Sequence, residues 1–287
     1  MNIINNLNNQ EIIDYGVKSI NAMSQWSETQ GENINIAILD TGIDYTHKDL
    51  IDRVKGGANF TSPDILNYMD RNGHGTFVAG IISATKNGSG IIGVAPKANL
   101  YAVKVLNDQG KGNPLWIEDG INWSVNNGIQ IISMSLGYDR ESPETYEAIK
   151  SAYHKGVIMV AATGNDPTKS LIDYPARYDE VIGVTAIDQF EQVGRFCNRD
   201  NGLDIELAAP GVDVISTYLN NTYAIASGTS FACPHITGAI ALLQAKAFRR
   251  YSRFLTLHEI KLLLEMNTKD LGTRGKDNQY GFGLFHF

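Results

Sequence analysis

Cysteine is scarce in this chain, since Cys197 and Cys233 are the only two among 287 residues. A scaffold held together by disulfides needs a much higher density of cysteine, so that class is excluded. Cys233 lies in an apolar run, which predicts a small buried residue. A disulfide between the two cysteines is the less favoured alternative.

Long apolar runs are also missing. None approaches the roughly 18 residues of a membrane-spanning helix, so we expect no membrane partner. The first ten residues lack the basic and apolar regions of a signal peptide. We therefore expect a cytoplasmic protein, with secretion as the alternative if a targeting segment precedes this sequence.

An excess of basic charge is absent as well. Lys and Arg number 24 against 31 Asp and Glu, which gives a net charge of −7. Nucleic-acid binding calls for a basic face, so we expect no nucleic-acid partner.

Apolar runs that are typical of buried strands alternate with helical patterns, and 43% of the residues are hydrophobic. This alternation predicts an α/β fold with a mostly parallel sheet and helices on both faces. The strand-like runs span residues 34–39, 100–106, 129–136, 157–162 and 181–187. Helices are predicted at 116–125, between the Ser142-Pro143 start and Gly156, and after the Thr256–Glu259 capping box.

Polar or glycine-rich residues follow three of these predicted strands. Asp40 and Gly137 come directly after an apolar run, and the pair Gly164-Asn165 follows the run that ends at Ala162. Ligand sites in parallel sheets form at the carboxyl ends of strands, so these residues are expected to border one crevice.

The stretch Gly-Thr-Ser-Phe-Ala-Cys-Pro-His, residues 228–235, precedes a long apolar helix pattern. A proline inside a helix costs about 3 kcal/mol, but in the first turn the cost nearly vanishes. We therefore predict a helix start near Thr229 or Ser230. Ser230 then lies at an open helix end, as a nucleophile or as an ordinary N-cap serine.

Glycine and small residues surround an acid, an imidazole, a hydroxyl and an amide. The four segments are Leu39–Asp44, Arg71–Gly80, Gly228–His235 and Ala161–Asn165. Acyl transfer needs these groups: a hydroxyl that attacks, an imidazole that takes its proton, a carboxylate that orients the imidazole, and a donor for the oxyanion.

The order of these motifs resembles that of the subtilisin (subtilase) family of serine proteases, from Tyr15-Gly-Val17 to Tyr280–Leu284. The resemblance implies a three-layer fold and one catalytic domain, residues 1–287, with residues 1–14 as an N-terminal arm. It also implies that Asp40 orients His74, that His74 is the general base and that Ser230 is the nucleophile. Asn165 and the amide of Ser230 would form the oxyanion hole.

The same resemblance implies how a peptide or protein substrate binds. Ser135, Leu136 and Gly137 would pair with it as an added strand, and Ala162 and Gly164 would border it. Asp173 aligns with the base of the pocket for the residue before the cut (P1). A carboxylate there predicts a preference for Lys or Arg, with a solvated loop carboxylate as the alternative.

A structural calcium ion is a further expectation from the resemblance, because the loop Thr85–Ile91 has the family length. Asp49 by itself also fits a carboxylate at a helix start. Calcium prefers six to eight oxygen ligands. The expected ligands are side-chain oxygens of Asp49, Asn87 and Glu11 (or Gln10) and the carbonyls of Thr85, Ser89 and Ile91.

Three biological roles fit these motifs. Asp173 and Tyr138, which stands where the family often has glycine, favour a dedicated leader-peptide protease of lantibiotic biosynthesis. The alternatives are an intracellular subtilisin of general protein turnover and an inactive, peptide-binding pseudoprotease. The sequence leaves the oligomeric state open.

Overall fold

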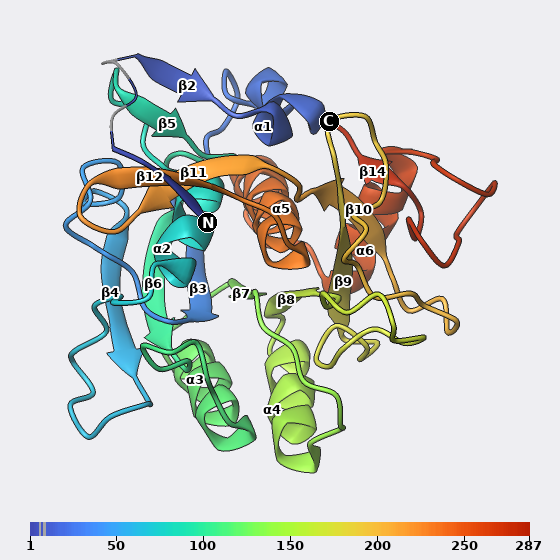
Figure 1. Ribbon diagram of the computed structural model, residues 1–287, viewed down its shortest axis with the longest axis horizontal. Coiled ribbons are helices and arrows are strands. Elements are labelled where there is room, and N and C mark those ends of the chain that lie inside the picture. The colour runs from blue at the N-terminus through green and yellow to red at the C-terminus, as the bar shows by residue number, and fades with distance from the viewer. Residues whose placement is uncertain (6, 8–9) are drawn as a thin grey trace.

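The computed structural model describes residues 1–5, 7 and 10–287, and a nine-stranded sheet forms its centre (Figure 1). All neighbouring strands run parallel except β13 and β14, which confirms the predicted mostly parallel sheet. In spatial order the strands are β13 (Thr268–Lys269), β14 (Leu284–Phe285), β10 (Leu207–Pro210), β9 (Val181–Ile187), β8 (Ile158–Ala162), β7 (Ile131–Met134), β3 (Asn35–Asp40), β6 (Asn99–Lys104) and β4 (Val54–Asn59).

Helices cover both faces of this sheet (Figure 1). Helices α2 (His74–Ser83) and α5 (Thr229–Tyr251) lie on one face, and α3 (Pro114–Asn126) and α4 (Pro143–His154) lie on the other. The predicted cap of α4 is confirmed, because the Ser142 side chain accepts a hydrogen bond from the Thr145 amide. These layers are the predicted three-layer arrangement.

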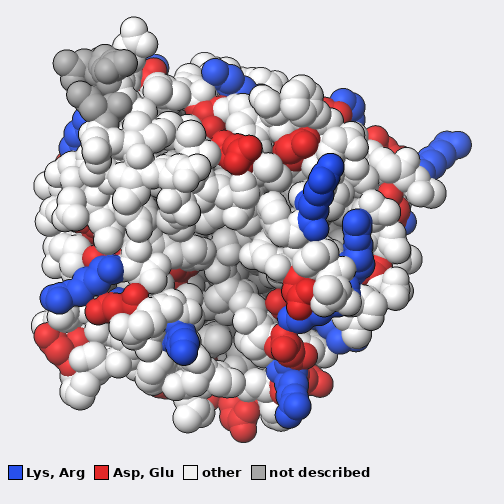
Figure 2. Space-filling view, in the orientation of Figure 1, with Lys and Arg blue, Asp and Glu red and all other residues white. Residues whose placement is uncertain are grey.

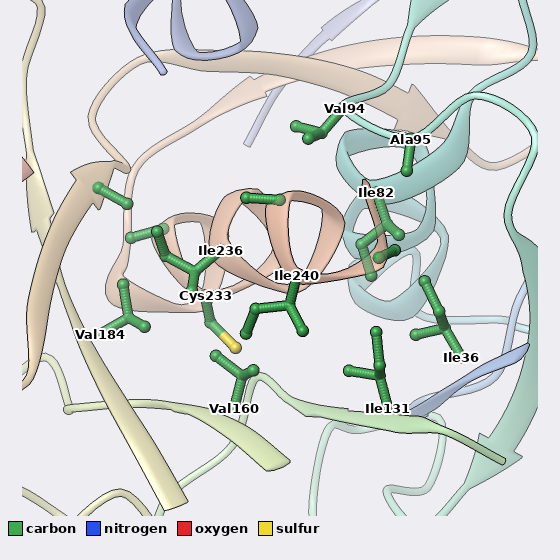
Figure 3. Packing of buried hydrophobic residues seen from close by; sticks show 14 of the residues in the cluster. Ile36, Ile82, Val94, Ala95, Ile131, Val160, Val184, Cys233, Ile236 and Ile240 are labelled. Carbon is green, nitrogen blue, oxygen red and sulfur yellow. The ribbon is translucent and has the colours of Figure 1, made fainter. Parts of the chain in front are cut away.

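The strands of the centre are buried on both sides, which explains their uninterrupted apolar sequence. Alternate residues of β3 point to opposite faces. Ile36 and Ile38 belong to the core beneath α5, whereas Ala37 and Leu39 belong to the core beneath α3. Figure 3 shows Ile36 and Ile131 near the helices that carry Ile82 and Ile240.

Smaller elements complete the chain. Strand β1 (Asn2–Ile4) pairs with β12 (Thr222–Ala226), which pairs with β11 (Val214–Tyr218), and β2 (Glu11–Ile13) pairs with β5 (Gly90–Ile92). The remaining helices are α1 (Tyr15–Ser19), the 3₁₀ turn η1 (Ala22–Gln25) and α6 (Leu257–Met266), whose predicted Thr256–Glu259 capping box is present. Strands β1 and β2 of the N-terminal arm thus each belong to a small sheet.

Both cysteines are buried and free, which excludes the alternative of a disulfide between them. Among the described residues, no helix is long and apolar enough to cross a membrane. On the face drawn in Figure 2, basic and acidic side chains are interspersed around a largely uncharged centre.

Candidate active site

The segments that end or follow β7 and β8 and the N-terminal residues of α2 and α5 border one cavity, at the carboxyl ends of the parallel strands as expected. The cavity has a volume of about 410 Å³. Its lining includes every predicted catalytic and substrate-binding residue except Asp40: His74, Ser135, Leu136, Gly137, Ala162, Gly164, Asn165, Asp173 and Ser230.

Asp40 lies directly beneath the imidazole of His74. The Nδ1 atom of His74 is 2.8 Å from Oδ1 and 2.9 Å from Oδ2 of Asp40. The carboxylate is fully buried and also accepts the Thr41 amide at 2.7 Å. A buried carboxylate is costly without such partners. The contact assigns the ring proton to Nδ1 and leaves Nε2 able to accept a proton.

Two glycines allow His74 to begin helix α2 so close to the strand. Gly73 caps the helix at φ +100°, and a Cβ there would lie 2.1 Å from the Tyr218 ring. A Cβ on Gly75 would lie 2.1 Å from the Gly42 carbonyl oxygen. Both positions therefore require glycine, because any side chain there would clash with its neighbours.

The pKa of His74 is raised above its ordinary value. Burial of the ring opposes the charged form, but the adjacent charge and hydrogen bond of Asp40 outweigh it, and the charge of Asp70 adds to them. The ring is nevertheless 22% exposed, so it can meet a substrate in the cavity.

Asp70 is a second buried carboxylate that sequence reasoning missed. Its Oδ1 accepts the amides of Asn72 and Gly73 and the Thr41 hydroxyl, and its Oδ2 accepts the amide and hydroxyl of Thr76. It therefore fixes the loop that carries His74. An aspartate two residues before an Asn-Gly pair was the available signal.

Ser230 is the second residue of α5, and the predicted helix start is confirmed. Its hydroxyl donates to the Ser135 carbonyl at 3.3 Å. Among the described residues, no hydrogen bond joins Ser230 to His74, although both line the cavity. Phe231 packs beside both motifs, with its ring centroid 5.5 Å from that of His74 and 4.4 Å from that of Phe77.

Pro234 is the sixth residue of α5, beyond the first turn in which the sequence argument placed it. Because proline has no N–H, the Ser230 carbonyl lacks its usual helical donor. The Ser135 hydroxyl donates to this carbonyl instead, at 2.7 Å. Ser135 and Ser230 thus exchange two hydrogen bonds.

Asn165 is oriented by the residue before Ser230. Its Oδ1 accepts the Thr229 amide at 2.9 Å and the Thr229 hydroxyl at 3.0 Å. The Gly164 amide donates to the same hydroxyl at 3.2 Å. With its oxygen engaged, the Asn165 side chain offers its nitrogen as a donor to the cavity.

The segment that follows β7 forms one wall of the cavity. Tyr138 and Tyr174 exchange backbone hydrogen bonds of 2.8 and 3.0 Å as an antiparallel bridge. Their rings stack with centroids 6.1 Å apart. The backbone of Tyr138, on one side of this segment, is therefore already hydrogen-bonded within the protein.

Asp173 lies in the cavity lining, and its carboxylate is paired within the protein. Its Oδ1 accepts from Lys169 at 2.8 Å and from the Asn198 amide at 3.1 Å. Lys169 also contacts Asp139. Sequence reasoning missed Lys169, because only Asp173 is near it in sequence (i,i+4), whereas Asp139 is 30 residues away.

The predicted calcium ligands Asp49, Asn87 and Glu11 lie together. The Asn87 amide group donates to Asp49 at 3.0 Å, and the Asn87 backbone N–H donates to Glu11 at 2.8 Å. Asp49 also accepts from Tyr223 and Ile91, and it lies in a turn, so the helix-start alternative is wrong.

The oxygen set of this loop suits calcium, which takes neutral and backbone oxygens as well as carboxylates. Among the described residues, the buried Thr85 hydroxyl has no hydrogen-bond partner. Within the same residues, no three His, Cys, Asp or Glu side chains form a cluster that could hold a metal.

The fold and this cavity define a protease of the serine class, and comparison with known proteins gives the family. Residues 31–283 match the peptidase S8 group described as the subtilase family. The chain belongs to this family and is a subtilisin-like serine protease, a hydrolase.

Curated relatives cover most of the chain. It is 42% identical over 281 residues to an intracellular serine protease of Paenibacillus polymyxa, spanning 96% of this chain and 85% of the relative. It is 41% identical over 266 residues to the major intracellular serine protease of Bacillus subtilis strain 168 (88% and 83%). The minor extracellular protease Epr of the same strain is 42% identical over 260 residues (90% and 38%).

Proposed function

We propose that the chain is an endopeptidase with Ser230 as nucleophile, His74 as general base and Asp40 as the group that orients the base. The observation that carries this proposal is the contact of both Asp40 oxygens with Nδ1 of His74, beside a cavity that Ser230 shares. In this proposal the Ser230 hydroxyl, which donates to the Ser135 carbonyl in the structure, donates to Nε2 of His74 when substrate is bound.

The reaction proceeds through an acyl-enzyme. The Ser230 oxygen bonds to the scissile carbonyl carbon while its proton passes to His74. The amide nitrogen of Asn165 and the backbone amide of Ser230 stabilise the negative oxygen. The C–N bond then breaks as His74 protonates the leaving amine. Water then loses a proton to His74 as its oxygen bonds to the ester carbon, and His74 returns this proton to the departing Ser230 oxygen.

This assignment is tested with Ser230→Ala. A fluorophosphonate label, which reacts with activated serines, is expected on the wild type and not on the variant. A variant that takes the label as the wild type does contradicts the assignment of Ser230 as nucleophile. A wild type that takes no label contradicts it too, and would instead favour a peptide-binding pseudoprotease.

We further propose that the substrate lies along Ser135, Leu136 and Gly137 as an added strand, with Ala162 and Gly164 beside its P1 residue. The antiparallel bridge between Tyr138 and Tyr174 supports this arrangement, because it holds the backbone next to Gly137 on one side. Asp173 in the lining supports a preference for Lys or Arg at P1.

The P1 preference is tested by Asp173→Gly with matched peptides that carry Arg or Phe before the cut. We expect the ratio of kcat/KM for Arg over Phe to fall about tenfold or more, because a cation loses its carboxylate partner. Equal ratios in the two proteins contradict a role for Asp173 in selection.

For biological role, we propose an intracellular enzyme of general protein turnover, supported by the names of two relatives. Dedicated processing of one leader peptide, as in lantibiotic biosynthesis, is the second candidate, favoured by Asp173 and by Tyr138 at the cavity. Digestion of casein at many sites supports turnover. Cleavage of a single-site basic peptide with casein left intact supports processing.

Calcium is proposed as a structural ion held by Asp49, Asn87 and Glu11 with the carbonyls of Thr85, Ser89 and Ile91. The grouping of the three side chains supports it. Such an ion would link the N-terminal arm to the loop Thr85–Ile91.

A further inference from the structure

A lysine lies behind the proposed P1 carboxylate. Lys169 contacts Asp173 at 2.8 Å and also contacts Asp139, so one cation serves two anions. The two carboxylates differ in setting, because the Asp173 side chain is 13% exposed and that of Asp139 is 73% exposed. Solvent therefore screens Asp139 far more than Asp173.

The two oxygens of Asp173 face different surroundings. Oδ1 receives Lys169 and the Asn198 amide. Oδ2 lies against the glycines of the two walls, since a Cβ on Gly137 or Gly164 would lie 3.1 or 2.5 Å from it. One oxygen is thus engaged within the protein, and the other faces the space between the walls that border a P1 side chain.

Backbone hydrogen bonds fix the position of Lys169 in its loop. Its backbone N–H donates to the Asp166 carbonyl at 3.0 Å, and its own carbonyl accepts the Arg199 amide at 3.2 Å. Partial burial opposes the charge of its ammonium group, but the hydrogen bonds to Asp139 and Asp173 outweigh this and raise its pKa. Lys169 therefore stays positively charged throughout the neutral range.

We propose that Lys169 is a specificity-determining residue that weakens the pull of Asp173 on a cationic P1 side chain, while Asp139 limits this effect by sharing the lysine. A substrate Lys or Arg would have to share Asp173 with the resident cation. This inference rests on the proposed P1 preference. It makes basic residues favoured at P1 rather than required there.

The experiment compares kcat/KM for matched peptides with Arg, Phe or Glu at P1. In Lys169→Gln we expect the Arg-to-Phe ratio to rise about tenfold and the Glu peptide to be cleaved more slowly. In Asp139→Asn we expect the opposite shift, about threefold, because the lysine then acts on Asp173 alone. Lys169→Arg keeps the charge and should stay close to wild type.

Lys150→Gln is the matched control, since Lys150 forms an ion pair with Glu147 on helix α4 and does not line the cavity. Its Arg-to-Phe ratio should equal that of the wild type. A general loss of all three activities in Lys169→Gln, with unchanged ratios, would show a merely structural lysine and overturn the proposal. Equal shifts of the Arg-to-Phe ratio in Lys169→Gln and Lys169→Arg would also overturn the proposal.

Failure of this inference differs from failure of the P1 proposal. If Asp173→Gly lowers the Arg-to-Phe ratio and Lys169→Gln leaves it unchanged, the inference is wrong and the P1 proposal stands. If both ratios stay at the wild-type value, Asp173 does not select the substrate, and the inference is overturned with it.

Discussion

Two buried carboxylates near His74 have different roles. Asp40 contacts the His74 ring, whereas Asp70 uses its oxygens on backbone amides and hydroxyls of the same loop. Both charges raise the pKa of His74. The second carboxylate therefore combines positioning with an electrostatic effect at a distance.

We predict that kcat/KM rises with pH with a midpoint above the ordinary histidine value of about 6.5. Below its pKa, His74 carries a proton at Nε2 and cannot take one from Ser230, so a raised pKa moves the rise upward. Asp70→Asn removes one of the two charges and should move the midpoint downward. The measurement is the pH profile of kcat/KM.

Asp52→Asn, at an exposed position, is the control and should leave the profile in place. Asp70→Asn should also lower the free energy of unfolding by about 2 kcal/mol, because an amide cannot accept at both positions. A destabilised variant with the wild-type midpoint would mean that Asp70 acts on the fold alone.

Helix α5 has a proline at a position where most helices need an amide, and the segment after β7 supplies the missing donor. In Ser135→Ala the Ser230 carbonyl loses this partner, and we expect a loss of about 1 kcal/mol of stability. With Pro234→Ala, the helix gains an amide for the same carbonyl. The Ser135 substitution should then cost less, with a coupling of about 1 kcal/mol.

Urea unfolding of all four proteins in a Ser230→Ala background, which prevents self-digestion, measures this coupling. Strictly additive effects would contradict the compensation. Catalytic assays in the active background are a second readout, since the Ser230 hydroxyl also uses the Ser135 backbone.

Elements with strong sequence signals were the ones predicted. Strand β9 has the predicted bounds, Val181–Ile187, because a run buried on both faces is apolar throughout. Short strands such as β1, which is mostly exposed, and the two-residue β13 leave no such run. Their formation depends on partners far away in the sequence, so local patterns could not reveal them.

The whole molecule joins the residues of the site from distant segments, and this limits prediction from sequence. Glycine-rich surroundings marked Asp40, His74 and Ser230, since close backbone approach demands glycine locally. Asp70 and Lys169 each also contact a distant segment, through Thr41 and Asp139 respectively, and these contacts form only in the folded chain. Both lie in loops where charged residues are ordinarily solvated.

At this scale we predict that calcium stabilises the protein. Removing it with EDTA should lower Tm by about 5–10 °C, because an ion that binds only the folded state adds to its stability. Calcium should restore Tm, and magnesium, which prefers a smaller octahedral site, should not. The measurement is thermal unfolding of Ser230→Ala.

Asp49→Asn tests the proposed site separately. The variant loses a partner of Tyr223 and starts less stable, so the informative quantity is the change in Tm on adding calcium. That change should vanish in the variant. A wild-type Tm that ignores both EDTA and calcium would rule out the ion.

The bond between Asn165 and Thr229 has a mechanical consequence. The side chain proposed to bind the oxyanion is fastened to the residue immediately before the proposed nucleophile. If helix α5 shifts by a fraction of an ångström, both groups travel together. Thermal motion elsewhere in the sheet therefore changes the distance between these two groups very little. The oxyanion donor and the nucleophile keep their relative position even when outer parts of the protein move.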